Sequence, residues 1–241
     1  MYRPEFRIDK KGMPIVKKEK IGDIAQNFVQ DFCPAALEQP QALDVDNFAE
    51  FYLRLDLDYR FFVGDNSILG MTVFCDYEDL RCGTIIINKE LASNNRQRHR
   101  YRFTVARECG HWVFHRRYYN YNPDQMELFA TECERPCYTE CRTVNQREDS
   151  FNMPKWSDER WREWHADKFA SAFLMPKRAV DIMKKGFGKE LSSGEVVFEF
   201  VNMMVEVFDV SAQAAYYRLD ELNYISCNKL SEDQISLIRD D

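Results

Sequence analysis

Residues 102–115 restrict the fold of this 241-residue chain more than any other segment, because they read R-F-T-V-A-R-E-C-G-H-W-V-F-H. Replacing Arg107 by histidine would create H-E-x-x-H, in which two histidines on one helical face bind Zn²⁺ and the glutamate activates a water. Glu108 and His111 occupy the remaining positions of that motif. A guanidinium stays protonated and has no lone pair for a metal, so the segment predicts a helix with an incomplete metal site.

The composition sets modest limits on class and location. With 45% hydrophobic and 14% aromatic residues, the chain can bury one sizeable core. Its net charge of −7 argues against a protein that coats nucleic acid, and the basic runs at 17–20 and 96–102 are typical of solvated faces. No segment resembles a signal peptide or approaches the length of a membrane span. We therefore expect a cytoplasmic protein that contacts neither membrane nor nucleic acid directly.

The spacing of apolar residues predicts an α+β fold. Helices are expected over 18–32, 44–55, 101–115, 158–175, 195–208 and 211–222, the last with Ser211 as its N-cap. Three β-rich runs, at 59–63, 68–74 and 84–87, predict a small sheet of about three strands, and 116–156 is expected to be irregular. We expect a single domain over 1–241, with a core over 18–176 and a helical C-terminal subdomain over 177–241.

A second segment, residues 161–176, adds polar groups that could complete a site. It reads W-R-E-W-H-A-D-K-F-A-S-A-F-L-M-P, and Glu163, Ala166, Asp167 and Ala170 fall on one helical face. The two alanines would let another backbone approach closely. Glu163 could then supply a third, carboxylate ligand, and Asp167 could orient His111 by a hydrogen bond. The alternative is an amphipathic core helix whose small residues serve packing alone.

Four segments in the same order carry a family pattern. Residues 102–115 and 163–176 are similar to R-F-T-x-A-H-E-x-G-H-W-x-x-H followed by E-W-x-A-D-x-F-A-x-x-L-L-M-P. The strand at 68–74 and V-S-A-Q-A-A-Y-Y-R-L at 210–219 are similar to flanking elements of the same pattern. The chain thus resembles the ImmA/IrrE family of metallo-endopeptidases. The resemblance implies a zincin-like metallopeptidase fold, a zinc cofactor, and a role in regulatory proteolysis of partners that are often DNA-binding repressors.

The resemblance also implies roles for individual residues. It makes Glu108 the catalytic general base, and His111 and Glu163 metal ligands. Asp167 would orient His111 without binding the metal itself. Arg107 stands where the family has its other histidine ligand, so the role of that ligand cannot be assigned to Arg107. A unit charge about 5 Å from Zn²⁺ at an effective dielectric of ~20 is repelled by roughly 6 to 7 kcal/mol, so this arginine opposes a metal.

Two readings of the Arg107 position remain open at this point. In the first, zinc still binds because the arginine swings away, or because His115 or His165 replaces the missing ligand, but His115 is expected to face the core with a backbone hydrogen bond and His165 to lie on the surface. More simply, the guanidinium could occupy the place of the metal and pair with Glu163 and Glu108. We favour that second reading, in which a degenerate site with little or no hydrolysis binds a repressor-like regulatory protein. The alternative is an active zinc endopeptidase with a rearranged metal site.

The cysteines offer a third, weaker function. Eight mostly scattered cysteines favour reduced thiols over a disulfide framework. Cys133, Cys137 and Cys141 follow one another at four-residue spacing and could hold a structural zinc or act as a redox sensor. Pro136 interrupts that segment, so three free thiols in a loop are favoured. Cys109 lies about 200° around the helix from Arg107 and is expected to point into the core.

Overall fold

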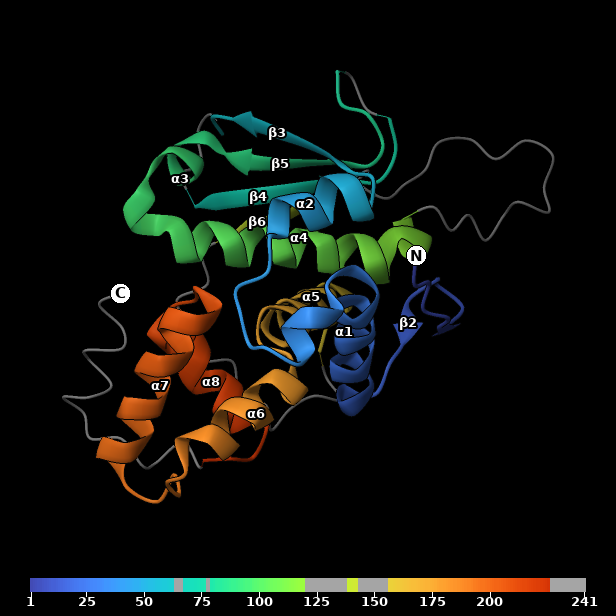
Figure 1. Cartoon of the computed structure of the whole chain (residues 1–241). Coiled ribbons are helices and arrows are strands. Elements are labelled where there is room, and N and C mark those ends of the chain that lie inside the picture. The colour runs from blue at the N-terminus through green and yellow to red at the C-terminus, as the bar shows by residue number, and fades with distance from the viewer. Residues whose placement is uncertain (63–66, 77–78, 120–137, 143–155, 226–241) are drawn as a thin grey trace. The chain divides into compact units, whose positions relative to one another are not determined.

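The structure is a computed structural model (Figure 1). It describes residues 1–62, 67–76, 79–119, 138–142 and 156–225, of which 140–142 are described in the backbone alone. Its chain divides into two compact units. The sheet unit comprises Arg3–Ile21 and Val45–Ala170, and the helical unit comprises Met1–Tyr2, Gly22–Asp44 and Ser171–Asp241.

The predicted α+β class is confirmed. The described residues form eight α-helices, a four-stranded mixed sheet and a small two-stranded sheet. The helices are α1 (Lys18–Phe32), α2 (Val45–Asn47), α3 (Lys89–Ser93), α4 (Arg98–Tyr119), α5 (Asp158–Leu174), α6 (Lys177–Phe187), α7 (Gly194–Phe208) and α8 (Ala212–Glu221). The strands are β1 (Arg7–Ile8), β2 (Pro14–Ile15), β3 (Asp56–Arg60), β4 (Ile68–Val73), β5 (Thr84–Asn88) and β6 (Tyr138–Arg142).

The four-stranded sheet has the order β3-β5-β4-β6. Strand β3 runs parallel to β5, whereas β4 is antiparallel to both β5 and β6. All five residues of β5 are buried, as its run of three isoleucines predicts for a central strand. The fourth strand, β6, lies within the segment expected to be irregular. Its polar residues carry no strand pattern, and it forms because backbone groups of β4 pair with it.

Most predicted helices agree with the structure, and one does not. Helices α1 and α5 match their predicted ranges, and α4 extends past both ends of its predicted range. The expected helix over 44–55 is instead the single turn α2 followed by a π-helical segment, Phe48–Tyr52. Short 3₁₀ turns cover Pro34–Leu37 and Asn95–Gln97. The side chain of Asn94 caps the second of these turns by accepting from the amide of Arg96, just before α4 begins.

Helix α4 lies along one face of the sheet (Figure 1). The rings of Trp112 and Tyr119 stack on Phe74 at centroid distances of 5.9 and 4.2 Å. Gly70 of β4 allows a close approach, because a Cβ there would lie 2.8 Å from Cγ2 of Thr104 on α4. This contact brings the motif of α4 directly against the strand.

Helix α4 also packs closely on the first part of α5. A Cβ added at Gly110 would lie 3.1 Å from Cα of Ala166, so the two backbones approach where both residues are small. The prediction that the alanine face of α5 permits close approach is therefore confirmed. Next to this contact, Phe114 meets Phe169 edge to face at 5.8 Å.

Buried apolar residues of α6, α7 and α8 and a buried polar cluster stabilise the helical unit. Ser211 caps α8 by accepting from the amide of Ala214, as the sequence predicts. Arg218 of α8 donates from Nε to the carbonyl of Met175 at 2.9 Å and from Nη1 to Glu221 at 3.1 Å. The same glutamate accepts from Ser171 of α5 at 3.0 Å, which joins the end of α5 to α8.

Two further expectations concern the membrane and the thiols. No helix in the described ranges is long and apolar enough to cross a bilayer. The expectation of reduced thiols holds for Cys33, Cys82 and Cys109, which are free. It is wrong for Cys75, which forms a disulfide.

Candidate functional site between α4 and α5

Arg107 is the centre of a buried ion-pair cluster within the sheet unit. Its Nη2 donates to Oε2 of Glu163, and its Nε lies 2.9 Å from Oδ1 of Asp167. The arginine is only 6% exposed, whereas the side chains of Glu163 and Asp167 keep 27% and 46% of their surface in solvent. The predicted pairing of Arg107 with Glu163 is confirmed. The second carboxylate at the guanidinium is Asp167, in place of the expected Glu108.

Glu108 points the other way, into the contact between α4 and β4. It is fully buried, and its Oε2 accepts from the hydroxyl of Thr72 at 2.5 Å. Its Oε1 is buried without a hydrogen-bond partner in the described part of the chain. Burial outweighs the nearby positive groups and raises the pKa of this carboxyl. The absent side chain of Gly70 leaves room for it, since a Cβ there would lie 3.2 Å from Cγ of Glu108.

His111 lies between Glu163 and a second histidine. Its Nε2 is 3.6 Å from Oε1 of Glu163, and its Nδ1 is 3.1 Å from Nδ1 of His115. Burial acts to raise the pKa of Glu163, but its contacts with His111 and Arg107 prevail and lower that pKa to about 2. Glu163 is therefore an anion at neutral pH, held by the guanidinium of Arg107, with Nε2 of His111 3.6 Å from its other oxygen.

A third histidine continues this chain. Nε2 of His115 lies 3.4 Å from Nδ1 of His165, so three of the four histidines in the sequence form one buried row. Burial lowers the pKa of His115 well below its usual value and, with a smaller effect from His111, lowers the pKa of His165 to about 4. The core position predicted for His115 is confirmed, although its ring nitrogens face histidines instead of a backbone group.

The surface position expected for His165 is wrong. This residue is 2% exposed. Its ring stacks on Phe114 at 5.8 Å and lies 6.0 and 5.6 Å from the rings of Trp161 and Trp164. Aromatic side chains of α4 and α5 thus bury this histidine, although its neighbours in the sequence are mostly polar.

The side chains at this site do not fit a zinc ion. Catalytic zinc sites have three protein ligands, and here the available donors are His111 and Glu163. The remaining ligand position of the motif is occupied by Arg107. Its positive charge is already paired with Glu163, the carboxylate that a metal would need. Within the described residues, no three histidine, cysteine or acidic side chains converge in a way that could hold a metal.

The cysteine prediction falls largely outside the described structure. Cys133 and Cys137 are not among the described residues, and Cys141 lies in β6 with its side chain undescribed. A metal or redox role for these thiols stays a prediction. Cys109 is fully buried, as predicted, and burial raises the pKa of its thiol well above the usual value.

The sequence analysis did not identify Thr72 and Gly70 as parts of the site, nor the extension of the histidine row to His165. Thr72 and Gly70 lie two residues apart on one face of β4 and contact Glu108, but their types are ordinary for a strand. The row of three histidines was visible as His111 and His115 one turn apart, yet its extension to His165 depends on how α5 packs.

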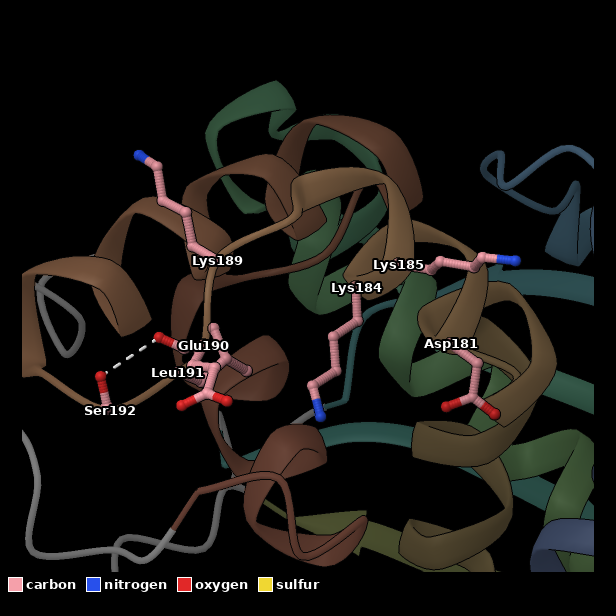
Figure 2. A pocket seen from close by; sticks show the side chains of 7 residues that line it. All are labelled: Asp181, Lys184, Lys185, Lys189, Glu190, Leu191 and Ser192. Atoms are coloured by element: carbon pink, nitrogen blue, oxygen red, sulfur yellow. Dashed lines mark hydrogen bonds between the residues drawn. The ribbon is translucent and has the colours of Figure 1, made fainter.

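The helical unit carries a surface hollow of about 510 Å³ at the end of α6. It is lined by Asp181, Lys184, Lys185, Lys189, Glu190, Leu191 and Ser192, and Figure 2 shows that the three lysines point in different directions. Lys189 is paired with Glu199 at 2.7 Å, and Lys184 lies over the ring of Tyr224 at 4.2 Å. These charges do not converge on a common point, so the hollow does not form a second candidate site.

No family model matches the chain, and neither a curated protein nor a solved structure matches it.

Proposed function

We propose that this protein is a non-catalytic derivative of an ImmA/IrrE-type metallo-endopeptidase, with a zincin-like fold, that binds a repressor-like regulatory protein without cleaving it. The observation that carries the proposal is the ion pair of Arg107 with Glu163. It joins the first position of the R-E-x-x-H motif to the acidic residue that the family resemblance assigns as third ligand.

The arrangement of elements supports the proposed fold. Strand β4 packs against α4, the helix that carries the motif, and the next described helix along the chain, α5, supplies the carboxylates. His111 and Glu163 face each other between α4 and α5, as two ligands of an ancestral metal site would, while Glu108 is turned to Thr72 of β4.

The chemistry of the replacement supports loss of hydrolysis. A guanidinium can hold two carboxylates from α5, as a metal would hold its ligand, but it cannot generate a metal-bound hydroxide. Glu108 is also poorly placed to act as a base here. It is fully buried, and its Oε2 is engaged by the hydroxyl of Thr72 on β4.

Metal content is the direct test. Wild type, Arg107→His and the control Arg107→His/Glu163→Gln would be purified identically and their zinc measured by mass spectrometry. We expect little zinc in wild type, about one equivalent in Arg107→His, and little in the control, because three ligands are needed. Zinc at about one equivalent in wild type, with chelator-sensitive cleavage of a repressor-like protein that Glu108→Gln abolishes, would instead establish the active endopeptidase.

Partner binding is tested separately. Wild type would be mixed with repressor-like proteins from its own source, and complexes would be isolated by size-exclusion chromatography and weighed by intact mass spectrometry. We expect a complex whose partner has an unchanged mass. A partner recovered as two fragments would contradict a purely binding role.

A further inference from the structure

We infer that His165, His115 and His111 form a one-way chain of hydrogen bonds that keeps a proton on Nε2 of His111, so that this nitrogen is withheld from any metal. The wild-type part of the inference stands on geometry alone. Its consequence for zinc rests on the proposed function.

The three rings are placed for such a chain. The Nδ1 atoms of His111 and His115 are 3.1 Å apart, and Nε2 of His115 is 3.4 Å from Nδ1 of His165. All three residues are buried, with exposed fractions of 0 to 2%. A neutral imidazole has one N–H and one bare nitrogen, so neutral rings in this arrangement can form the chain in only two directions.

Glu163 decides between the two directions. Its Oε1 faces Nε2 of His111 at 3.6 Å, and an ionised carboxylate can only accept hydrogen bonds. A bare Nε2 would set its lone pair against those of the carboxylate in a buried site, whereas a protonated Nε2 directs a positive N–H edge at the carboxylate across 3.6 Å. Arg107 donates to the other oxygen of Glu163 and so holds it as an anion.

The rest of the chain follows from that one proton. With Nε2 of His111 protonated, its Nδ1 is bare and accepts from Nδ1–H of His115. Nε2 of His115 is then bare and accepts from Nδ1–H of His165. His115 and His165 are thus positioning residues, because they act on the site through the tautomer and ring orientation of His111.

A metal at Glu163 and His111 would require the opposite direction. A histidine binds zinc through a bare nitrogen, and its other N–H is normally held by a neighbouring acceptor. Nε2 of His111 would have to lose its proton, Nδ1–H would donate to His115, and Nε2–H of His115 would donate to His165. The chain can reverse without any net change in protonation of the three rings.

Nuclear magnetic resonance on full-length wild type labelled with ¹⁵N-histidine tests the chain without metal or partner. At about pH 8, where an ordinary imidazole is neutral, the two ring nitrogens resonate in separate ranges according to protonation. We expect protons on Nε2 of His111 and on Nδ1 of both His115 and His165, with scalar coupling across the His115–His111 hydrogen bond. A bare Nε2 and a protonated Nδ1 in His111 would overturn the inference.

The same spectra of zinc-loaded Arg107→His test the reversal. We expect the proton of His111 on Nδ1, and a zinc affinity that falls 10- to 100-fold, roughly, in Arg107→His/His115→Phe. The matched variant Arg107→His/His115→Gln keeps a side-chain acceptor and should recover part of the loss. Unchanged affinity in both would overturn the positioning role. Failure of Arg107→His to bind zinc would contradict the proposed function, whereas the wild-type spectrum decides the chain by itself.

Discussion

Two buried arginines each bind groups of another segment, but their surroundings differ. They are Arg107 in the sheet unit and Arg218 in the helical unit. Arg107 is 6% exposed and pairs with Glu163 and Asp167, and Arg218 is 5% exposed and binds Glu221 and the carbonyl of Met175. Each links α5 or the residue after it to another helix.

The neighbours of the two arginines differ. Around Arg218, Glu221 also accepts from Ser171, and none of these three side chains has a buried polar atom left without a partner within the described structure. Next to Arg107, Oε1 of Glu108 and Nε2 of His111 are buried without hydrogen bonds to described residues. Buried polar atoms normally have hydrogen-bond partners. Two such atoms without one among the described residues therefore indicate that these residues are not explained by their contribution to packing and stability. Arg218 thus belongs to a satisfied structural cluster, whereas Arg107 lies beside polar atoms that the described residues leave unsatisfied, which agrees with the proposed loss of a metal site.

The largest expected effect is at Arg218. Arg218→Ala would leave Glu221, whose side chain is 13% exposed, without its cation and would free the carbonyl of Met175. Removing one partner of a buried ion pair typically costs about 3–5 kcal/mol of unfolding free energy. Urea unfolding would measure the loss, with Arg178→Ala, an exposed arginine of the same unit, as the control. A loss no larger than that of the control would contradict a structural role for Arg218.

Acid should weaken the sheet unit through its histidine row. Burial lowers the folded-state pKa of His165 to about 4 and that of His115 well below its usual value, so the unfolded chain binds protons first as the pH falls. The stability from the neutral rings is complete above about pH 6.5 and is lost as the pH falls toward about 4. Each ring contributes a slope of up to about 1.4 kcal/mol per pH unit.

Unfolding curves measured between pH 8 and pH 4 check this slope. His165→Gln should flatten it, and His99→Gln, at the start of α4, serves as the control. An identical slope in wild type and His165→Gln would contradict burial of a neutral His165. The contribution of Glu163 has a different window. Its pKa is lowered to about 2, so its stabilisation is present above its ordinary value of 4.5 and is lost only as the pH falls toward about 2.

Arg107→Ala should cost less than Arg218→Ala, about 2 kcal/mol, because Glu163 and Asp167 can turn to solvent when the cation is gone. The double variant Arg107→Ala/Glu163→Gln should recover part of the loss, since it also removes the carboxylate left behind. Thermal and urea unfolding of the pair would show this recovery. A loss at Arg107 equal to that at Arg218 would remove the distinction between the two arginines.

The smallest expected effect is at Thr72. Thr72→Val keeps the shape of the strand residue but removes the donor to Glu108, and such a bond contributes about 1 kcal/mol. Thr104→Val, whose hydroxyl donates to the carbonyl of Arg100 within α4, is a matched control. If Thr72→Val were neutral while the control lost stability, Glu108 would not depend on the strand for its orientation.

Local patterns were sufficient for the elements that carry the candidate site. The apolar spacing of α1 and α5, the Ser211 cap and the isoleucine run of β5 each depend on neighbours within a few residues, and all agree with the structure. Ala166, one of the two alanines predicted to permit close approach, lies where α5 meets α4 at Gly110. The pairing of Arg107 with Glu163 was expected because the family resemblance places both residues at one metal site, where a guanidinium could replace the zinc.

Long-range contacts explain the differences. Strand β6 forms on the backbone of β4 without a pattern of its own, and His165 is buried because aromatic rings from α4 and α5 surround it. Asp167 pairs with Arg107, and Glu108 accepts from Thr72, because the packing of the backbones places these donors within reach of each carboxylate. These choices depend on distances of a few ångströms between segments far apart in the chain.

The sequence by itself determined that α4 would be a helix carrying an arginine, a glutamate and a histidine in motif spacing, since helical periodicity and a fixed positive charge are local properties. Only the tertiary structure decided which carboxylates hold that arginine, which polar atoms lack a hydrogen bond to the described residues, and that three histidines form one row. The physical reason is that hydrogen bonds and desolvation act over the length of one contact, and the close packing of α4, α5 and β4 sets those contacts.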